Sequence, residues 1–179
     1  GLGGGVSSIV LRRRYASAPD VYELARRLRP ATRQRGCLLL VNVRADVAVA
    51  VDADGVHLGE RSLPVAAARR VLRPGMMVGR SVHNLDETGQ FEDEGVDYLF
   101  LGPIFETLSH PGEKGIGLEA YREAVLRSRV PVVGIGGIDG ENVRLIAQAG
   151  GPGAAAIGAF YAALDAAETA RAFRAAFAP

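Results

Sequence analysis

Short apolar runs alternate with amphipathic segments along the whole chain. The apolar runs predict strands near residues 7–13, 37–43, 55–59, 76–82, 97–104, 130–136 and 153–159. Between them, apolar residues recur at helical spacing, which predicts helices near 19–35, 64–73, 85–95, 118–128, 140–149 and 161–177. The apolar link at 45–53 is long enough for one or two helical turns. Strands this apolar, separated by helices, indicate a parallel sheet covered on both faces.

Residues that start and stop helices stand at the borders of these segments. Pro19, Pro64 and Asn84 suit helix starts, and Asn84 is a good N-cap because its side-chain oxygen can accept from a free backbone N–H. Gly95 and Gly150 suit the left-handed conformation that ends many helices. These signals support the order of elements given by the apolar pattern.

The alternation fits two α/β architectures. A doubly wound sheet usually has fewer strands than the seven predicted here, and an (α/β)8 TIM barrel needs one more. The glycine-rich start at 1–5 stands where a first strand and helix would have ended. We therefore expect a single TIM-barrel domain over 1–179 whose first βα unit is missing from this chain. The doubly wound sheet remains the alternative.

Composition narrows the class of protein further. With 179 residues, 48% of them hydrophobic, the chain can bury one sizeable core. A formal charge of +1 argues against nucleic acid as a partner, and no apolar run or leader indicates a membrane. The single cysteine, Cys37, heads an apolar run and fits a buried thiol in a reducing compartment. We expect a cytoplasmic protein, and homo-oligomer formation stays open.

Four motifs, in this order along the chain, carry a resemblance to a known family. They are "LVNVRADVAVAVDADGVHLGERSLPVAAARRVL", "VGRSVHNLDE", "DYLFLGPIFET" and "VPVVGIGGIDGENV". Together they resemble the thiamine phosphate synthase/TenI superfamily over about Ser8 to Phe160. The fold that this resemblance implies is the (α/β)8 barrel, in agreement with the periodicity.

The chain departs from the synthases of this family at the metal site and the pyrophosphate site. The resemblance implies two Asp residues that hold a magnesium bridging a pyrophosphate, and their positions are Val43 and Ser62 here. Magnesium prefers carboxylate oxygens, which neither residue has. The Gln and two Lys that bind the pyrimidine pyrophosphate correspond to Val10, Arg14 and His110. These departures disfavour synthase activity.

The segments "SVH" and "FET" are similar instead to the TenI branch, which implies thiazole tautomerase activity. That reaction aromatises a carboxylated thiazole phosphate by a proton shift, with no metal and no cofactor. A histidine can take and return the proton. The acid/base His of the TenI pattern is replaced by Pro103, so we expect His83 or His110 to take the catalytic role.

Other polar residues suit a small phosphorylated thiazole that carries a carboxylate. If Arg12 and Arg14 face the barrel mouth, they can bind the carboxylate bidentately; ion pairs at the surface are the alternative. The remaining candidate contacts are Asn42 and Ser81, by match to the family, and Thr107 and Ser109 in the sixth loop. His57 lies in the middle of a strand, which favours a core histidine with satisfied hydrogen bonds.

Two glycine-rich loops predict the phosphate site. "GIGGI" at 134–138 and "AIGAF" at 156–160 follow the last two strands, whose loops commonly bind phosphate in barrels. The candidate residues are Gly136, Gly137, Ile157 and Gly158. Besides the tautomerase, three functions stay open: an inactive ligand-binding or regulatory homologue, a thiamine phosphate synthase, and a different phosphate-binding barrel isomerase.

Overall fold

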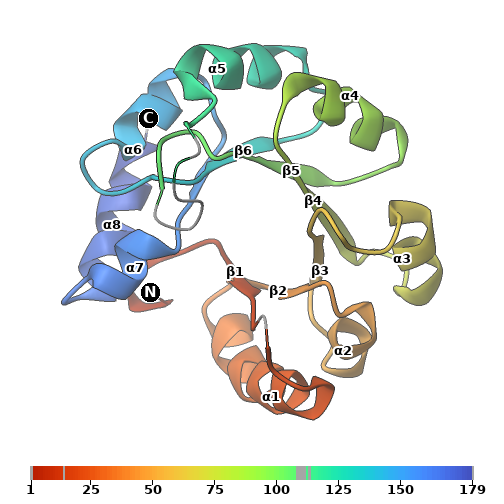
Figure 1. Ribbon diagram of the computed structural model, residues 1–179. Helices are drawn as coiled ribbons and strands as arrows, with labels where there is room; N and C mark the ends of the chain where they lie inside the picture. The colour runs from red at the N-terminus through yellow and green to blue at the C-terminus, as the bar shows by residue number, and fades with distance from the viewer. Residues whose placement is uncertain (1, 14, 108–111, 113, 179) are drawn as a thin grey trace.

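The computed structural model describes residues 2–13, 15–107, 112 and 114–178, and its centre is a curled sheet ringed by helices (Figure 1). The sheet has seven strands: β1 Ser8–Leu11, β2 Leu38–Asn42, β3 Gly55–Leu58, β4 Met77–Val82, β5 Tyr98–Leu101, β6 Val132–Ile135 and β7 Ala154–Ala155. Every neighbouring pair is parallel. The predicted α/β fold class is confirmed.

The strand order separates the two predicted architectures. The strands lie side by side in chain order from β1 to β7, without the reversal of order that a doubly wound sheet requires. The sheet curls toward a barrel, but no pairing joins β1 to β7 within the described residues. The fold is that of a TIM-like barrel that lacks one unit, and the doubly wound alternative is wrong.

The helices lie mainly on the outside of the curled sheet, with the last two near the N-terminal segment (Figure 1). They are α1 Ala18–Gln34, α2 Ala45–Ala50, α3 Val65–Val71, α4 Leu85–Asp93, α5 Gly117–Arg127, α6 Val143–Gln148, α7 Gly158–Ala162 and α8 Ala166–Ala176, preceded by the 3-10 helix η1 Leu2–Gly4. Asn84 caps α4 as predicted. The single helix predicted over 161–177 is wrong: Asp165 caps a new helix there, accepting from the Ala167 N–H. Among the described residues, no helix is long and apolar enough to cross a membrane.

Side chains of alternate strand residues fill two separate cores. The larger lies between the sheet and the helices, and the smaller lies inside the curl, built on Leu40, Tyr98 and Phe100. Glycine at position 79 leaves room for the Tyr98 ring in this inner core, because a Cβ there would lie 1.9 Å from Tyr98 Cζ. The inner core closes the centre of the barrel beneath the strand ends.

Aspartates that precede strands fasten neighbouring strands at the amino ends of the sheet. Asp54 Oδ2 accepts from the Leu39 N–H at 2.7 Å, and Arg29 donates to both carboxylate oxygens at 2.6 and 3.0 Å. Asp97 repeats the arrangement, accepting from the Val78 N–H at 2.6 Å and from Arg69 at 2.7 Å. Burial acts to raise the pKa of Asp54, but the hydrogen bonds from Arg29 and Leu39 outweigh it and the pKa is lowered.

We predict that Asp54→Asn lowers the free energy of unfolding by about 2 kcal/mol at pH 7, because it leaves the partly buried Arg29 without its counter-charge. A carboxylate with a lowered folded-state pKa stabilises the fold above its unfolded pKa, and this contribution is lost as pH falls through the folded pKa. The difference in the free energy of unfolding between wild type and variant should therefore become smaller as pH falls below 3.8, the ordinary pKa of Asp.

Urea unfolding at a series of pH values measures this gap. The control is Glu141→Gln, an exposed carboxylate for which we expect no change. Equal stability of Asp54→Asn and wild type at pH 7 would contradict the role given to this ion pair.

Candidate functional site

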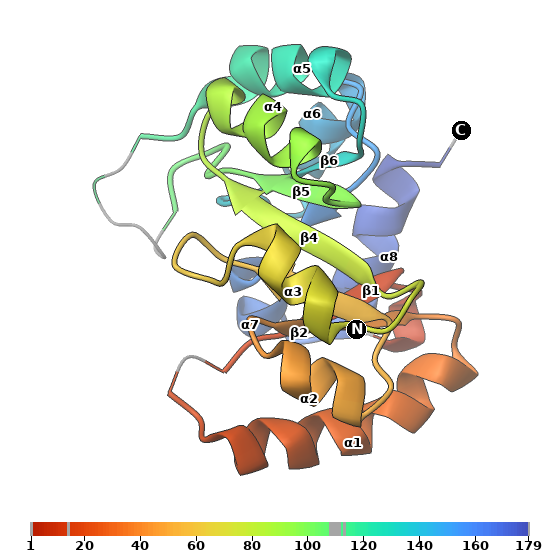
Figure 2. The same ribbon diagram turned by 90° about the vertical axis from the view of Figure 1, so that its right-hand side faces the viewer.

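The carboxyl ends of the strands meet at one rim, and the loops after β1, β3 and β5 project from that side (Figure 2). In the register of the sheet, Asn42 lies opposite His57, and Ser81 lies two residues beyond His57's partner on β4, Gly79. Arg12 follows the last residue of β1, which pairs with the residue before Asn42. The chain therefore brings four polar side chains from adjacent strands to one mouth.

His57 is the buried centre of this group, 4% exposed. Its Nδ1 lies 2.9 Å from Tyr98 Oη and its Nε2 lies 2.9 Å from Ser81 Oγ. Burial, together with the smaller effects of the charges of Arg12 and Arg80, lowers the pKa of His57 to about 3. At neutral pH the imidazole is uncharged, with one nitrogen donating and the other accepting. It fixes the Ser81 hydroxyl and does not exchange protons near neutrality.

The predicted catalytic histidines lie elsewhere or outside the described residues. The His83 side chain is 42% exposed beside α4, with Nδ1 3.5 Å from Glu87 Oε2. Its backbone N–H donates to the same carboxylate at 2.7 Å. His110, Ser109 and Arg14 lie outside the described residues, and Thr107 is half-buried on the β5–α5 loop. Of the residues predicted to bind the substrate, Arg12, Asn42 and Ser81 lie at the mouth, on or directly after strands β1, β2 and β4.

The glycines predicted to bind phosphate have a packing role that the sequence did not reveal. Gly136 and Gly137 have φ of 94° and 66°. A Cβ at Gly136 would lie 2.6 Å from Pro103 Cα, and one at Gly137 would lie 2.5 Å from the Glu106 carbonyl oxygen. These glycines let the β5–α5 loop pass close to the end of β6. Ile157 is the N-cap of α7 and Gly158 its first residue, at the same rim.

A carboxylate-held magnesium does not fit the two positions that the family resemblance implies. Val43 offers no ligand atom, and the Ser62 Oγ accepts from the Gly59 N–H at 2.8 Å within its own turn. The described part of the chain contains no group of three or more His, Cys, Asp or Glu residues able to hold a metal ion. Val43 has φ of +56°, a left-handed conformation that suits Asp or Asn and strains a β-branched residue.

Arg80 was missed by the sequence analysis, although an arginine inside the apolar run "MMVGRSV" was the available signal. It is 7% exposed and donates at 3.2 Å to the carbonyls of both Glu60 and Leu63. Its guanidinium carbon lies 4.4 Å from the centre of the Phe91 ring. No ion pair with a carboxylate forms here within the described residues. Arg80 thus ties the β3–α3 loop to β4 and brings an uncompensated positive charge under the mouth.

A parallel βα barrel with a polar, positively charged mouth is the layout of barrels that bind small anionic ligands at the ends of their strands. The family model described as thiamine monophosphate synthase matches residues 1–160. The chain belongs to this family.

Relatives and a solved structure agree with that assignment. The chain is 44% identical over 171 residues to the "Thiamine-phosphate synthase" of Chlorobium luteolum, covering 95% of this chain and 81% of that protein. It is 42% identical over 175 residues to that of Moorella thermoacetica, covering 97% and 83%. The structure of a thiamine phosphate pyrophosphorylase from Pyrococcus furiosus superposes with a TM-score of 0.90 at 37% identity, covering 98% of this chain and 85% of that one.

The prediction of a TenI-branch thiazole tautomerase, an isomerase, is wrong. The relatives at this identity are named synthases, over nearly the whole chain. Two short segments, "SVH" and "FET", had too little sequence to outweigh that likeness. The site agrees with the correction, because Pro103 has no group that transfers a proton and the His57 imidazole stays uncharged at neutral pH.

We predict that Val43→Asn raises the free energy of unfolding by about 1 kcal/mol, because Asn tolerates the left-handed backbone better than a β-branched residue. The Val43 side chain is 41% exposed, so little apolar burial is lost. Thermal or urea unfolding measures the change.

Val71→Asn is the matched control, since Val71 is 48% exposed and lies in α3. It should be neutral or slightly destabilising because Asn has the lower helix propensity near a helix end. A destabilised Val43→Asn would refute the strain assigned to this position.

Proposed function

We propose that the protein is a thiamine-phosphate synthase, which joins a phosphorylated thiazole to a pyrimidine that carries a pyrophosphate. The observation that supports this most directly is the identity of 44% and 42%, over 95% and 97% of the chain, to relatives that bear this name. The reaction forms one C–N bond from the thiazole nitrogen and breaks one C–O bond. The electron pair of the broken bond leaves with pyrophosphate.

The chemistry of the mouth supports a reaction of this type. The step requires no side chain to carry a proton, which suits a site whose buried histidine has a pKa of about 3. The Ser81 hydroxyl, which the neutral imidazole orients, can hydrogen-bond an uncharged heterocycle. The positive charges of Arg12 and Arg80 favour the negative charge that develops on departing pyrophosphate. Asn42 completes the polar lining on this side.

The phosphate of the thiazole has candidate partners on the opposite side of the mouth. The backbone N–H groups around Gly136, Gly137, Ile157 and Gly158 follow β6 and β7, the strands whose loops commonly bind phosphate in this fold. Binding there would leave the ring between the glycine loops and Ser81. Because magnesium does not fit Val43 and Ser62, no step is assigned to a metal.

A second candidate function is ligand binding without catalysis, which the lack of metal ligands at Val43 and Ser62 favours.

One assay distinguishes the synthase from a binding protein without catalytic activity. Purified protein is mixed with thiazole phosphate and the pyrimidine pyrophosphate, and thiamine phosphate and released pyrophosphate are quantified, with added magnesium and with excess chelator. We expect both products in equal amounts.

Ser81→Ala should lower kcat/KM by about 10-fold or more, because a hydrogen bond to the reacting heterocycle is lost. Ser7→Ala is the control and should leave the rate unchanged, because Ser7 directly precedes β1 and so lies at the opposite end of the strand from the mouth. No product under either condition, together with tight binding of either substrate, would replace the synthase by the binding function.

A further inference from the structure

The turn after β3 occupies the place where the family resemblance implies a metal ligand. The Gly59 N–H donates to Ser62 Oγ at 2.8 Å and the Ser62 N–H donates to the Gly59 carbonyl at 3.0 Å, which closes a tight turn. Arg80 holds the same turn from below through the Glu60 and Leu63 carbonyls. The segment between these bonds is fixed at several points, and Arg61 lies in it.

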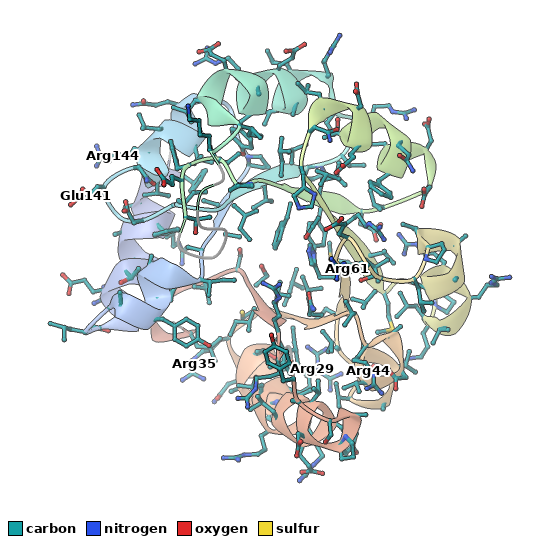
Figure 3. The ribbon with its side chains drawn as sticks, viewed as in Figure 1. Arg29, Arg35, Arg44, Arg61, Glu141 and Arg144 are labelled. Atoms are coloured by element: carbon teal, nitrogen blue, oxygen red, sulfur yellow. The ribbon has the colours of Figure 1, made fainter. Side chains whose placement is uncertain are left out.

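Arg61 is a cation that the fold presents at the mouth. Its side chain is exposed and lies at the rim beside β3 and β4 (Figure 3). Among the described residues, no carboxylate forms an ion pair with it. Arg44 provides the contrast: its Nε donates to Asp46 Oδ1 at 2.8 Å, and it lies beside α2. Of the two arginines in the loops that directly follow β2 and β3, Arg44 and Arg61, only Arg61 is left without an ion pair within the described residues.

We infer that Arg61 takes the place of a carboxylate-held magnesium and binds the pyrophosphate of the substrate directly through its guanidinium group. A guanidinium matches two phosphate oxygens at once, and its binding needs no acidic residue. The neighbouring charges of Arg12 and Arg80 act in the same direction, favouring an anion and opposing a divalent cation. The lack of carboxylates at Val43 and Ser62 and the unpaired charge of Arg61 then have the same explanation. This inference rests on the proposed function.

The test measures binding of inorganic pyrophosphate by calorimetry, so it is independent of turnover. Wild type should bind pyrophosphate in excess chelator, and millimolar magnesium should change the Kd by less than about 3-fold, because Val43 and Ser62 supply no carboxylate to hold the ion. Arg61→Ala should weaken binding by about 10-fold or more, and Arg61→Lys should recover only part, since the bidentate contact is lost. Arg35→Ala, an exposed arginine after α1, is the control and should bind as wild type does.

A double variant introduces the two carboxylates that the family resemblance implies as magnesium ligands. Val43→Asp combined with Ser62→Asp should make pyrophosphate binding magnesium-dependent, with Kd improving by about 10-fold or more on addition of the ion. Wild-type binding that requires magnesium, or an Arg61→Ala variant that binds unchanged, would overturn the inference. Metal-free binding through Arg61 without any thiamine phosphate formation would leave the inference standing and reject only the proposed function.

Discussion

The parallel alignment of all seven strands brings every carboxyl end to one rim, and the other features of the site depend on it. Residues from β1 to β4 that are far apart in sequence become neighbours there because adjacent strands run in register. The aspartates at the opposite end, Asp54 and Asp97, fasten pairs of strands through backbone N–H groups and arginines. A slip of one residue would turn Asn42 and His57 away from the mouth.

The charges that act on the buried centre of the mouth, His57, are positive. Arg12 and Arg80 both act on His57, which burial already keeps uncharged. A buried arginine is costly unless its donors are satisfied, and two loop carbonyls and the Phe91 ring offset part of this cost for Arg80, whose Nε has no hydrogen-bond partner. The same bonds shape the turn that presents Arg61. Arg80 therefore contributes both to holding the loop in place and to the positive charge of the mouth.

The two positions where the family resemblance implies metal ligands, Val43 and Ser62, have local structures that do not hold a cation. Val43 has a left-handed conformation that an Asp or Asn would adopt with less strain, and its side chain has no atom that binds a cation. Ser62 uses its oxygen within its own turn. The backbone at Val43 thus suits a residue such as Asp, while neither side chain supplies a carboxylate. Family membership alone does not reveal that these two positions lack a carboxylate.

The sequence by itself determined the strands, most helices and the barrel class, because apolar periodicity and caps such as Asn84 are local signals. It also identified Arg12, Asn42 and Ser81, which lie at the mouth. Only the tertiary structure decided the rest. The partners of His57, the bonds of Arg80 and the packing of Gly136 and Gly137 against the β5–α5 loop join residues distant in the chain. Local patterns carry no information on such contacts, since these are set by how strands and loops meet in space.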